Sequence, residues 1–187
     1  MKTILALACT ALLTMGFVAI AAAADDPAIK ARMQRLEDRE AIHDLLVTYG
    51  RLLDKRDLVG YSKLFAVDGV WEGGIGSAKG PEGIRQMLEK VYGGRVQPGQ
   101  YNSSYHIMSD FIIDVTGDTA TSWSRWTWIV EGADGKPGAQ RSGHYEDKLV
   151  REGGQWRFRH RLTITELPTA QKDTEAQIFR KDHRERD

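Results

Sequence analysis

The side chains of this sequence that could do acid–base chemistry stand singly, outside any recognised catalytic motif. His106 carries an imidazole, which titrates at about 6.5 when unperturbed and can accept a proton near neutral pH. Asp54 offers a carboxylate and Tyr49 a phenol, which can donate a hydrogen bond. Taken alone, Asp54 could equally pair with Lys55 or Arg56 at the end of a helix, and His106 could face solvent from a strand.

Several reaction types are excluded by motifs that the sequence lacks. No Gly-x-Ser-x-Gly segment marks a hydrolase nucleophile, and no His-Glu-x-x-His pair marks a zinc site. Gly73, Gly74 and Gly76 are followed by no Gly-Lys-Ser/Thr, so they indicate a surface turn and not a phosphate loop. The single cysteine, Cys9, lies in the N-terminal apolar run. We therefore expect no thiolate metal site, and no His, Asp and Glu set has convincing metal spacing.

The N-terminus has the features of an export signal. Lys2 precedes an apolar run over residues 4–20, and four alanines at residues 21–24 end it. The run is short for a membrane span and ends in alanines, not in a basic stop. We therefore expect cleavage near Ala24, with no membrane attachment afterwards and a periplasmic or secreted protein. Residues 25–187 would then carry almost balanced charge, which gives no reason to expect binding to nucleic acid.

Hydrophobic spacing predicts three helices in the first half of the remaining chain. Residues 27–56 form the longest, with Ile42, Leu46, Tyr49 and Leu53 on one face. A shorter helix is expected over residues 58–66, followed by a turn at residues 67–69, a strand beginning at Val70 and Trp71, and a loop at residues 73–76. Pro81 and Glu82 in a first turn predict a third helix to about Tyr92.

The second half changes to the two-residue period of strands. After a flexible connection over residues 93–100, strands are expected over residues 101–115, 119–131, 142–151 and 155–165, the last two joined by a Glu-Gly-Gly turn. Helices followed by antiparallel strands indicate an α+β fold. We expect a cone-shaped α+β barrel, in which a curved, mostly antiparallel sheet wraps around the long N-terminal helix. Residues 1–24 would be the signal peptide, 25–166 the domain and 167–187 a charged tail.

Four segments between residues 35 and 163 resemble the SnoaL-like branch of the nuclear transport factor 2 superfamily. They are Arg35–Ile42 with Tyr49 and Leu53–Arg56, Val70–Glu72 with Gly80–Gly83, Tyr105-His106, and Gly143–Asp147 with Gly154–Phe158 and Arg161. The branch includes scytalone dehydratase, bile acid 7α-dehydratase and hexachlorocyclohexane dehydrochlorinase. The resemblance implies a pocket at the open end of the cone and no cofactor.

The resemblance also implies roles for particular residues. Asp54 and His106 match an Asp–His pair in which the imidazole takes a proton from carbon and the carboxylate fixes its tautomer. Tyr49 matches a tyrosine of the bile acid dehydratase; five residues of helix span about 7.5 Å and turn by roughly 140°, so Tyr49 and Asp54 would reach one pocket from different flanks. A packed core tyrosine is the alternative for Tyr49.

The remaining candidates would bind substrate. Arg161 matches a pocket arginine of the dehydrochlorinase, although alternation with Arg157 and Arg159 would place it outside and His160 inside. Aromatic side chains that could wall the pocket, or simply pack in a core or interface, are Trp71, Trp126, Trp128 and Tyr145.

The expected function is that of a cofactor-independent lyase, similar to a dehydratase, acting on a small or medium hydrophobic molecule. An isomerase with the same base, a non-catalytic periplasmic binding protein and a sheet that serves only assembly are the alternatives. We also expect a homo-oligomer, a trimer by resemblance or else a dimer, through a sheet face with large residues such as Trp123 or its neighbours Trp126 and Trp128. The sequence names neither the substrate nor the choice between dehydration, dehydrohalogenation and isomerisation.

Overall fold

The computed structural model describes residues 26–93 and 104–168. The chain divides into two compact units, Met1–Glu40 and Ala41–Asp187. The predicted signal peptide, most of the predicted connection over residues 93–100 and nearly all of the charged tail lie outside the described residues. No helix in the described part is long and apolar enough to cross a membrane.

Helix α2 (Pro27–Asp54) is the long N-terminal helix that the sequence predicts. Its described part in the first unit is the helical stretch over residues 27–40. In the second unit, Ile42, Leu46, Tyr49 and Leu53 recur at spacings of three and four and are all buried. This face of α2 packs into the core against strands of the sheet, as the apolar spacing requires.

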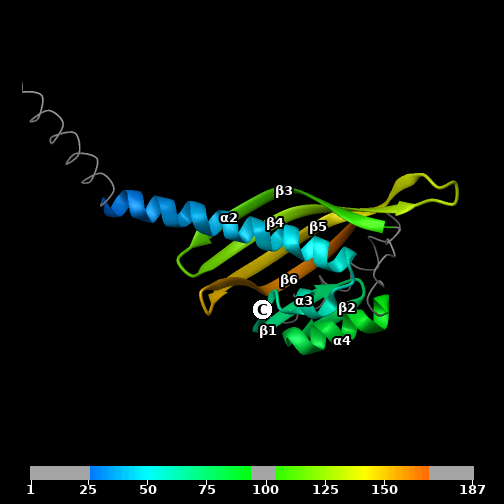
Figure 1. Ribbon diagram of the computed structural model, residues 1–187, viewed down its shortest axis with the longest axis horizontal. Helices are drawn as coiled ribbons and strands as arrows, with labels where there is room; N and C mark the ends of the chain where they lie inside the picture. Colours follow the sequence, from blue (N-terminus) through cyan, green and yellow to red (C-terminus); the bar gives the residue numbers. More distant parts are fainter. Residues whose placement is uncertain (1–25, 94–103, 169–187) are drawn as a thin grey trace, which may run out of the picture. The chain divides into compact units, whose positions relative to one another are not determined.

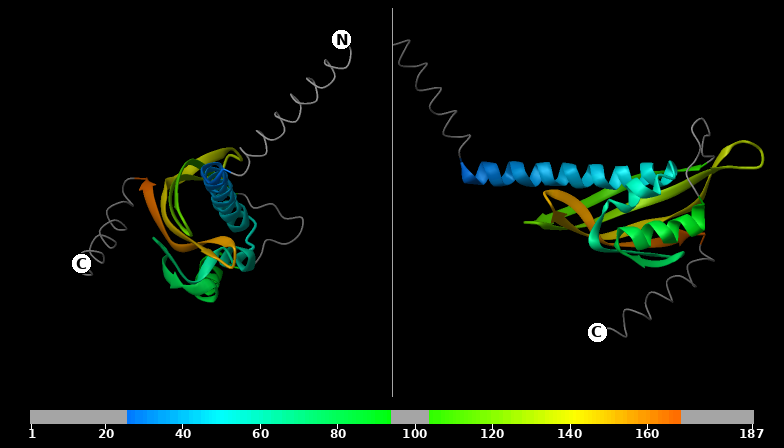
Figure 2. Two further views of the ribbon diagram at one scale, coloured as in Figure 1. Left: turned by 90° about the vertical axis from the view of Figure 1, so that its left-hand side faces the viewer. Right: turned by 60° about the horizontal axis from the view of Figure 1, so that its bottom comes forward.

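The second unit contains a curved, unclosed sheet of six strands (Figure 1; Figure 2). The strands are β1 (Phe65–Gly73), β2 (Gly76–Lys79), β3 (Ser104–Thr116), β4 (Thr119–Glu131), β5 (Pro137–Glu152) and β6 (Gln155–Leu167). Their order is β2-β1-β6-β5-β4-β3, and only β1 and β6 pair in parallel. The α+β fold with a mostly antiparallel sheet is confirmed.

The second predicted helix is shorter than expected, because strand pairing takes over its end. Helix α3 (Leu58–Ser62) begins at Asp57, whose carboxylate accepts the backbone N–H of Gly60 at 3.1 Å. Phe65 and Ala66, predicted as helix, instead begin β1, where Phe65 lies beside Phe158 of β6. The backbone N–H of Phe158 also donates to the carbonyl of Leu64 at 2.9 Å, which ties this segment to the sheet.

The turn predicted at residues 67–69 is wrong, and an irregularity inside β1 takes its place. Phe65 pairs with Phe158 and Val70 pairs with His160. The chain therefore advances five residues along β1 for every two along β6 between these pairs. A bulge of this kind inserts extra residues without ending the strand. The loop predicted at residues 73–76 is also partly wrong, since Gly76 begins the short strand β2, which pairs antiparallel with β1. Helix α4 (Gly80–Tyr92) agrees with the prediction.

Candidate active site

Asp54 and His106 meet where the end of α2 lies against β3. The Asp54 Oδ1 lies 2.6 Å from Nδ1 of the His106 ring, and the backbone N–H of His106 donates to both carboxylate oxygens at 3.0 and 3.2 Å. The two side chains are largely buried, with 14% of His106 and 21% of Asp54 exposed. A carboxylate that binds both the ring and the main chain of one residue holds that ring in a single orientation.

This geometry determines which nitrogen of a neutral His106 carries the proton. An ionised carboxylate can only accept hydrogen bonds, so the Nδ1 that faces Asp54 must be the protonated nitrogen. The other nitrogen, Nε2, then has a free lone pair. The His106 ring lies in the wall of a pocket of about 420 Å³, whereas Asp54 is not part of that wall. The pair can therefore offer a proton acceptor to a pocket ligand from its Nε2 side.

The pocket walls are mainly aromatic. Trp71, Trp126, Trp128 and Tyr145, all candidates from the sequence, line it, and Tyr49 joins them. Trp128 stacks on the His106 ring, with 6.4 Å between ring centroids and 22° between planes. Side chains that also line the pocket but were not predicted are Tyr61, Tyr92, Leu53, Leu88, Val91, Ile75, Thr163, Thr165, Arg56 and Arg141.

Tyr49 is both a core residue and a pocket residue, so the two readings of this tyrosine are compatible. It is 1% exposed and its oxygen accepts a hydrogen bond from Nε1 of Trp71 at 3.0 Å. Because an indole N–H can only donate, Tyr49 keeps its own proton to donate elsewhere. Burial raises the pKa of neighbouring Tyr61, with a further contribution from Tyr49, and burial also raises the pKa of Tyr145. Tyr61 and Tyr145 therefore stay protonated at neutral pH.

Arg161 is not among the residues that line the pocket, and it lies behind the wall residues Tyr49 and Tyr145. It is completely buried and forms two hydrogen bonds to Asp147, from Nε at 2.7 Å and from Nη2 at 2.8 Å. Its guanidinium carbon lies 3.9 Å from the ring centroid of Tyr49 and 4.1 Å from those of Tyr145 and Phe158. Burial lowers the pKa of Arg161, but Asp147 together with Tyr49 and Tyr145 raises it above the ordinary value, so the group remains charged.

The alternation that placed Arg161 outside and His160 inside fails because β6 carries a bulge. Lys148 pairs with His160 and Leu149 with Phe158, which leaves Arg159 as an extra residue between them. One inserted residue reverses the facing of every later side chain. Arg161 therefore shares the inner face with Phe158, and His160 lies on the other face, where its Nε2 is 2.9 Å from Glu72.

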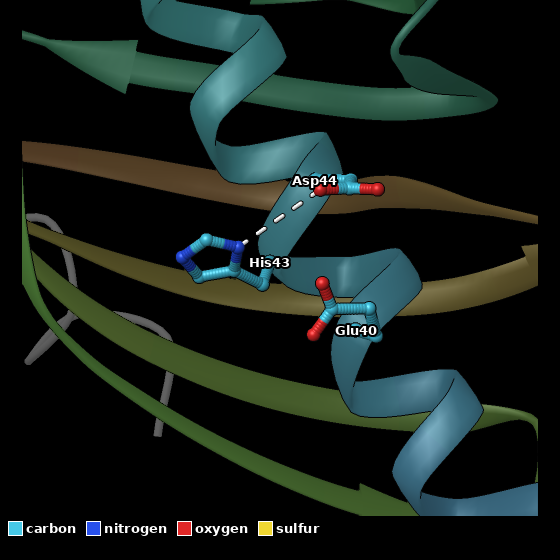
Figure 3. Close-up of side chains that lie close together, drawn as sticks. All are labelled: Glu40, His43 and Asp44. Atoms are coloured by element: carbon cyan, nitrogen blue, oxygen red, sulfur yellow. Dashed lines mark ion pairs between the residues drawn. The ribbon is translucent and has the colours of Figure 1, made fainter.

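One group in the described residues has side chains of the kind that bind metal ions. It is formed by Glu40, His43 and Asp44, which follow one another along α2 (Figure 3). Nδ1 of His43 lies 4.0 Å from the Asp44 carboxylate, and 75% of the Asp44 side chain is exposed. Exposed acidic groups of this type are common without a metal, and no second feature of these residues points to an ion.

An α+β domain with an open curved sheet and an aromatic pocket holding an Asp–His pair defines the class of this protein. The chain matches the SnoaL-like domain family over residues 34–162, and it belongs to that family. No curated protein matches the chain.

Solved structures agree with the assignment of the fold. The chain is similar to an NTF2-like protein with a cystatin-like fold from Novosphingobium aromaticivorans, with 26% identity, a TM-score of 0.65, and 80% of this chain and 96% of that chain covered. It is also similar to a protein of unknown function with a cystatin-like fold from Nostoc punctiforme, with 26% identity, a TM-score of 0.60, and coverage of 70% and 92%. A candidate scytalone dehydratase from Novosphingobium aromaticivorans shares the fold at 24% identity, with a TM-score of 0.58 and coverage of 71% and 87%.

Proposed function

We propose that this protein is a cofactor-independent lyase, similar to a dehydratase, that removes a proton from carbon in a hydrophobic molecule. The observation that carries the proposal is the 2.6 Å contact between Asp54 and Nδ1 of His106, with the ring in the pocket wall. A proton taken by Nε2 makes the ring positive, and the adjacent carboxylate stabilises that charge.

The steps of a dehydration can be written with the groups present. Nε2 of His106 takes the proton from the substrate carbon, and the electron pair of the C–H bond forms a carbon–carbon double bond as the neighbouring C–O bond breaks. The leaving hydroxyl takes a proton from the imidazolium and departs as water, which restores the neutral ring. Tyr49, which keeps its proton, can donate a hydrogen bond to the leaving oxygen or to a carbonyl.

An isomerase is the second candidate, because the same base performs its first step. There the proton on Nε2 returns to a different carbon and no bond to oxygen breaks. We also propose that the protein is exported, because residues 1–24 have the pattern of a signal peptide. A binding protein without turnover would use the same pocket and would need neither Asp54 nor His106 as a base.

A probe that needs only a base in an apolar pocket tests the proposal without the natural substrate. In 5-nitrobenzisoxazole, removal of the ring C–H proton breaks the N–O bond and gives a single coloured product, 2-cyano-4-nitrophenolate, which carries the new nitrile. We expect the wild type to open this ring about 100-fold faster than His106→Ala, since a positioned general base contributes at least that factor. Asp54→Asn should lose much of the rate, and the double variant should be little worse than His106→Ala, because the pair acts as a unit.

The control is His43→Ala, which removes a histidine from α2 outside the pocket and should keep the wild-type rate. The melting temperature of each variant shows whether a slower rate comes from loss of the base or from loss of the folded structure. A wild type no faster than His106→Ala would end the catalytic proposal and leave the binding protein in its place.

A further inference from the structure

We propose that the natural ligand of this pocket is an anion: a flat, ring-containing hydrophobic body that carries a carboxylate held by Arg56 and Arg141. The inference rests on the proposed function in that it concerns the same pocket, and it narrows the ligand from a hydrophobic molecule to an acidic one.

The charges of the pocket wall are all of one sign. Arg56 and Arg141 line it, and no aspartate or glutamate does so among residues 26–93 and 104–168. In that same part of the chain, neither Arg56 nor Arg141 forms an ion pair with a carboxylate. A guanidinium is always charged, and its planar donors match a carboxylate well. Two such groups in an aromatic pocket, with no counter-charge among the described residues, favour a ligand that brings the negative charge.

Arg56 occupies a position that normally holds glycine. The backbone N–H of Arg56 bonds the carbonyl of Leu53 at 3.0 Å, and that of Asp57 bonds the carbonyl of Leu52 at 2.9 Å, which is the Schellman pattern at the end of α2. Arg56 has a φ of 54°, in the left-handed region that disfavours a side chain. A function of the Arg56 side chain in the pocket would account for an arginine at such a strained position.

The side chain of Arg56 is directed over the pocket wall. Its guanidinium carbon lies 4.2 Å from the ring centroid of Tyr92, another wall residue. Burial and Tyr49 raise the pKa of Tyr92, whereas Arg56 and Arg141 both act to lower it. Arg56, Arg141 and Tyr92 line the same pocket, so one anionic group beside Tyr92 could be shared between the two cations.

Arg141 is placed by the register of the sheet. His106 of β3 pairs with Trp128 of β4, and Trp128 pairs with Arg141 of β5, so the three form one row across the sheet. A bulge at Gln140 precedes Arg141, since Trp128 pairs with Arg141 but Ile129 with Ala139. Neighbouring strands lie about 4.8 Å apart, so roughly 10 Å separates the backbones of His106 and Arg141. A ligand of one to three rings could lie on Trp128 with its anion at Arg141 and a carbon at His106.

Matched acids and amides test the inference, because they differ in charge while keeping nearly the same shape. The probes are 2-naphthoate with 2-naphthamide and biphenyl-4-carboxylate with its amide, and calorimetric titration gives each Kd. We expect at least one acid to bind the wild type about tenfold more tightly than its amide, as a charge-assisted pair would provide. That ratio should fall toward one in the Arg56→Gln/Arg141→Gln variant and at high salt.

The control is Arg51→Gln, which removes an exposed arginine of α2 outside the pocket wall and should keep the ratio. If neither acid binds better than its amide, or if the ratio survives loss of both arginines in a folded protein, the inference is overturned. If the double variant does not fold, the ratio of amide to acid Kd in the wild type alone tests whether the ligand is an anion.

The result can be separated from the fate of the proposed function. His106→Ala should abolish ring opening of 5-nitrobenzisoxazole but keep the preference for acids over amides. A protein that prefers acids without turning over the ring-opening probe would support the anionic ligand and contradict the lyase.

Discussion

At the scale of single residues, Asp54 matters because its carboxylate binds two different groups of His106. One is Nδ1 of the ring and the other is the backbone N–H, so the ring and the strand that carries it are positioned together. Asn at this position could keep the backbone contact through its carbonyl oxygen, but it could not stabilise an imidazolium by charge. This is why Asp54→Asn is expected to lower proton abstraction more than it lowers folding stability.

The position of a side chain in the site could be predicted where a family pattern includes that residue. It could not be predicted where a local irregularity of the backbone sets the direction of the side chain. Asp54 and His106 were found through the resemblance and the wall aromatics through their side-chain type. In the structure Asp54 contacts His106, and His106 and the aromatics line one pocket. The inward facing of Arg161 could not be predicted from a two-residue alternation, because the bulge at Arg159 has no signature in it. Arg56 and Arg141 were missed for similar reasons, since a left-handed helix end and a bulge at Gln140 direct their side chains.

At the scale of elements, the irregular strand β1 depends on Gly69. A Cβ built at Gly69 would lie 2.6 Å from the carbonyl oxygen of Phe158 and 3.0 Å from backbone atoms of Ala66. All of these neighbours are backbone, so none can move without disturbing the sheet. We expect Gly69→Ala to lower the free energy of unfolding by about 1–3 kcal/mol, as overpacking does in other cores. Urea denaturation measures the change.

Gly83 provides the matched control for that substitution. It lies in α4, and a Cβ there would have nothing within 4 Å. Gly83→Ala should therefore raise stability slightly, by about 0.5 kcal/mol, because alanine favours a helix. If Gly69→Ala and Gly83→Ala change the free energy of unfolding equally, close backbone contact at Gly69 does not determine the stability of β1.

Elements with long, regular patterns were predicted well, and short ones were not. Helix α2, helix α4 and strand β4 have nearly the expected bounds, because many residues contribute to each pattern. The strand at Val70 and Trp71 was predicted, but the first half of β1 was misassigned because it depends on pairing with β6, a partner about 90 residues away. No local pattern contains that information.

At the scale of the whole molecule, the homo-oligomer expected from the sequence remains a prediction, and the outer face of the sheet is where we expect it. Tyr105, Ile107 and Ile112 of β3 are 49%, 48% and 59% exposed. Trp123 is on the same row as Ile112, whereas Trp126 and Trp128 line the pocket and cannot serve this face. Apolar side chains gathered on one face favour a contact with a second copy.

Light scattering at micromolar concentration should give a trimer or dimer. The double substitution Ile107→Glu/Ile112→Glu should lower the measured mass toward that of a monomer, because the contact between copies would have to bury two charges. Val59→Glu, at an exposed apolar residue of α3, is the control and should leave the mass unchanged. A wild type that is monomeric throughout would contradict the expectation.

The central claim is that a neutral His106 presents an unprotonated Nε2 to the pocket because Asp54 holds the proton on Nδ1. Nitrogen NMR of the protein labelled with ¹⁵N-histidine tests this most directly, with the His106 signals assigned by their loss in His106→Ala. In the neutral ring we predict a protonated Nδ1 and a bare Nε2, and a loss of this preference in Asp54→Asn. A neutral His106 with its proton on Nε2 would leave no acceptor facing the pocket and would contradict the account.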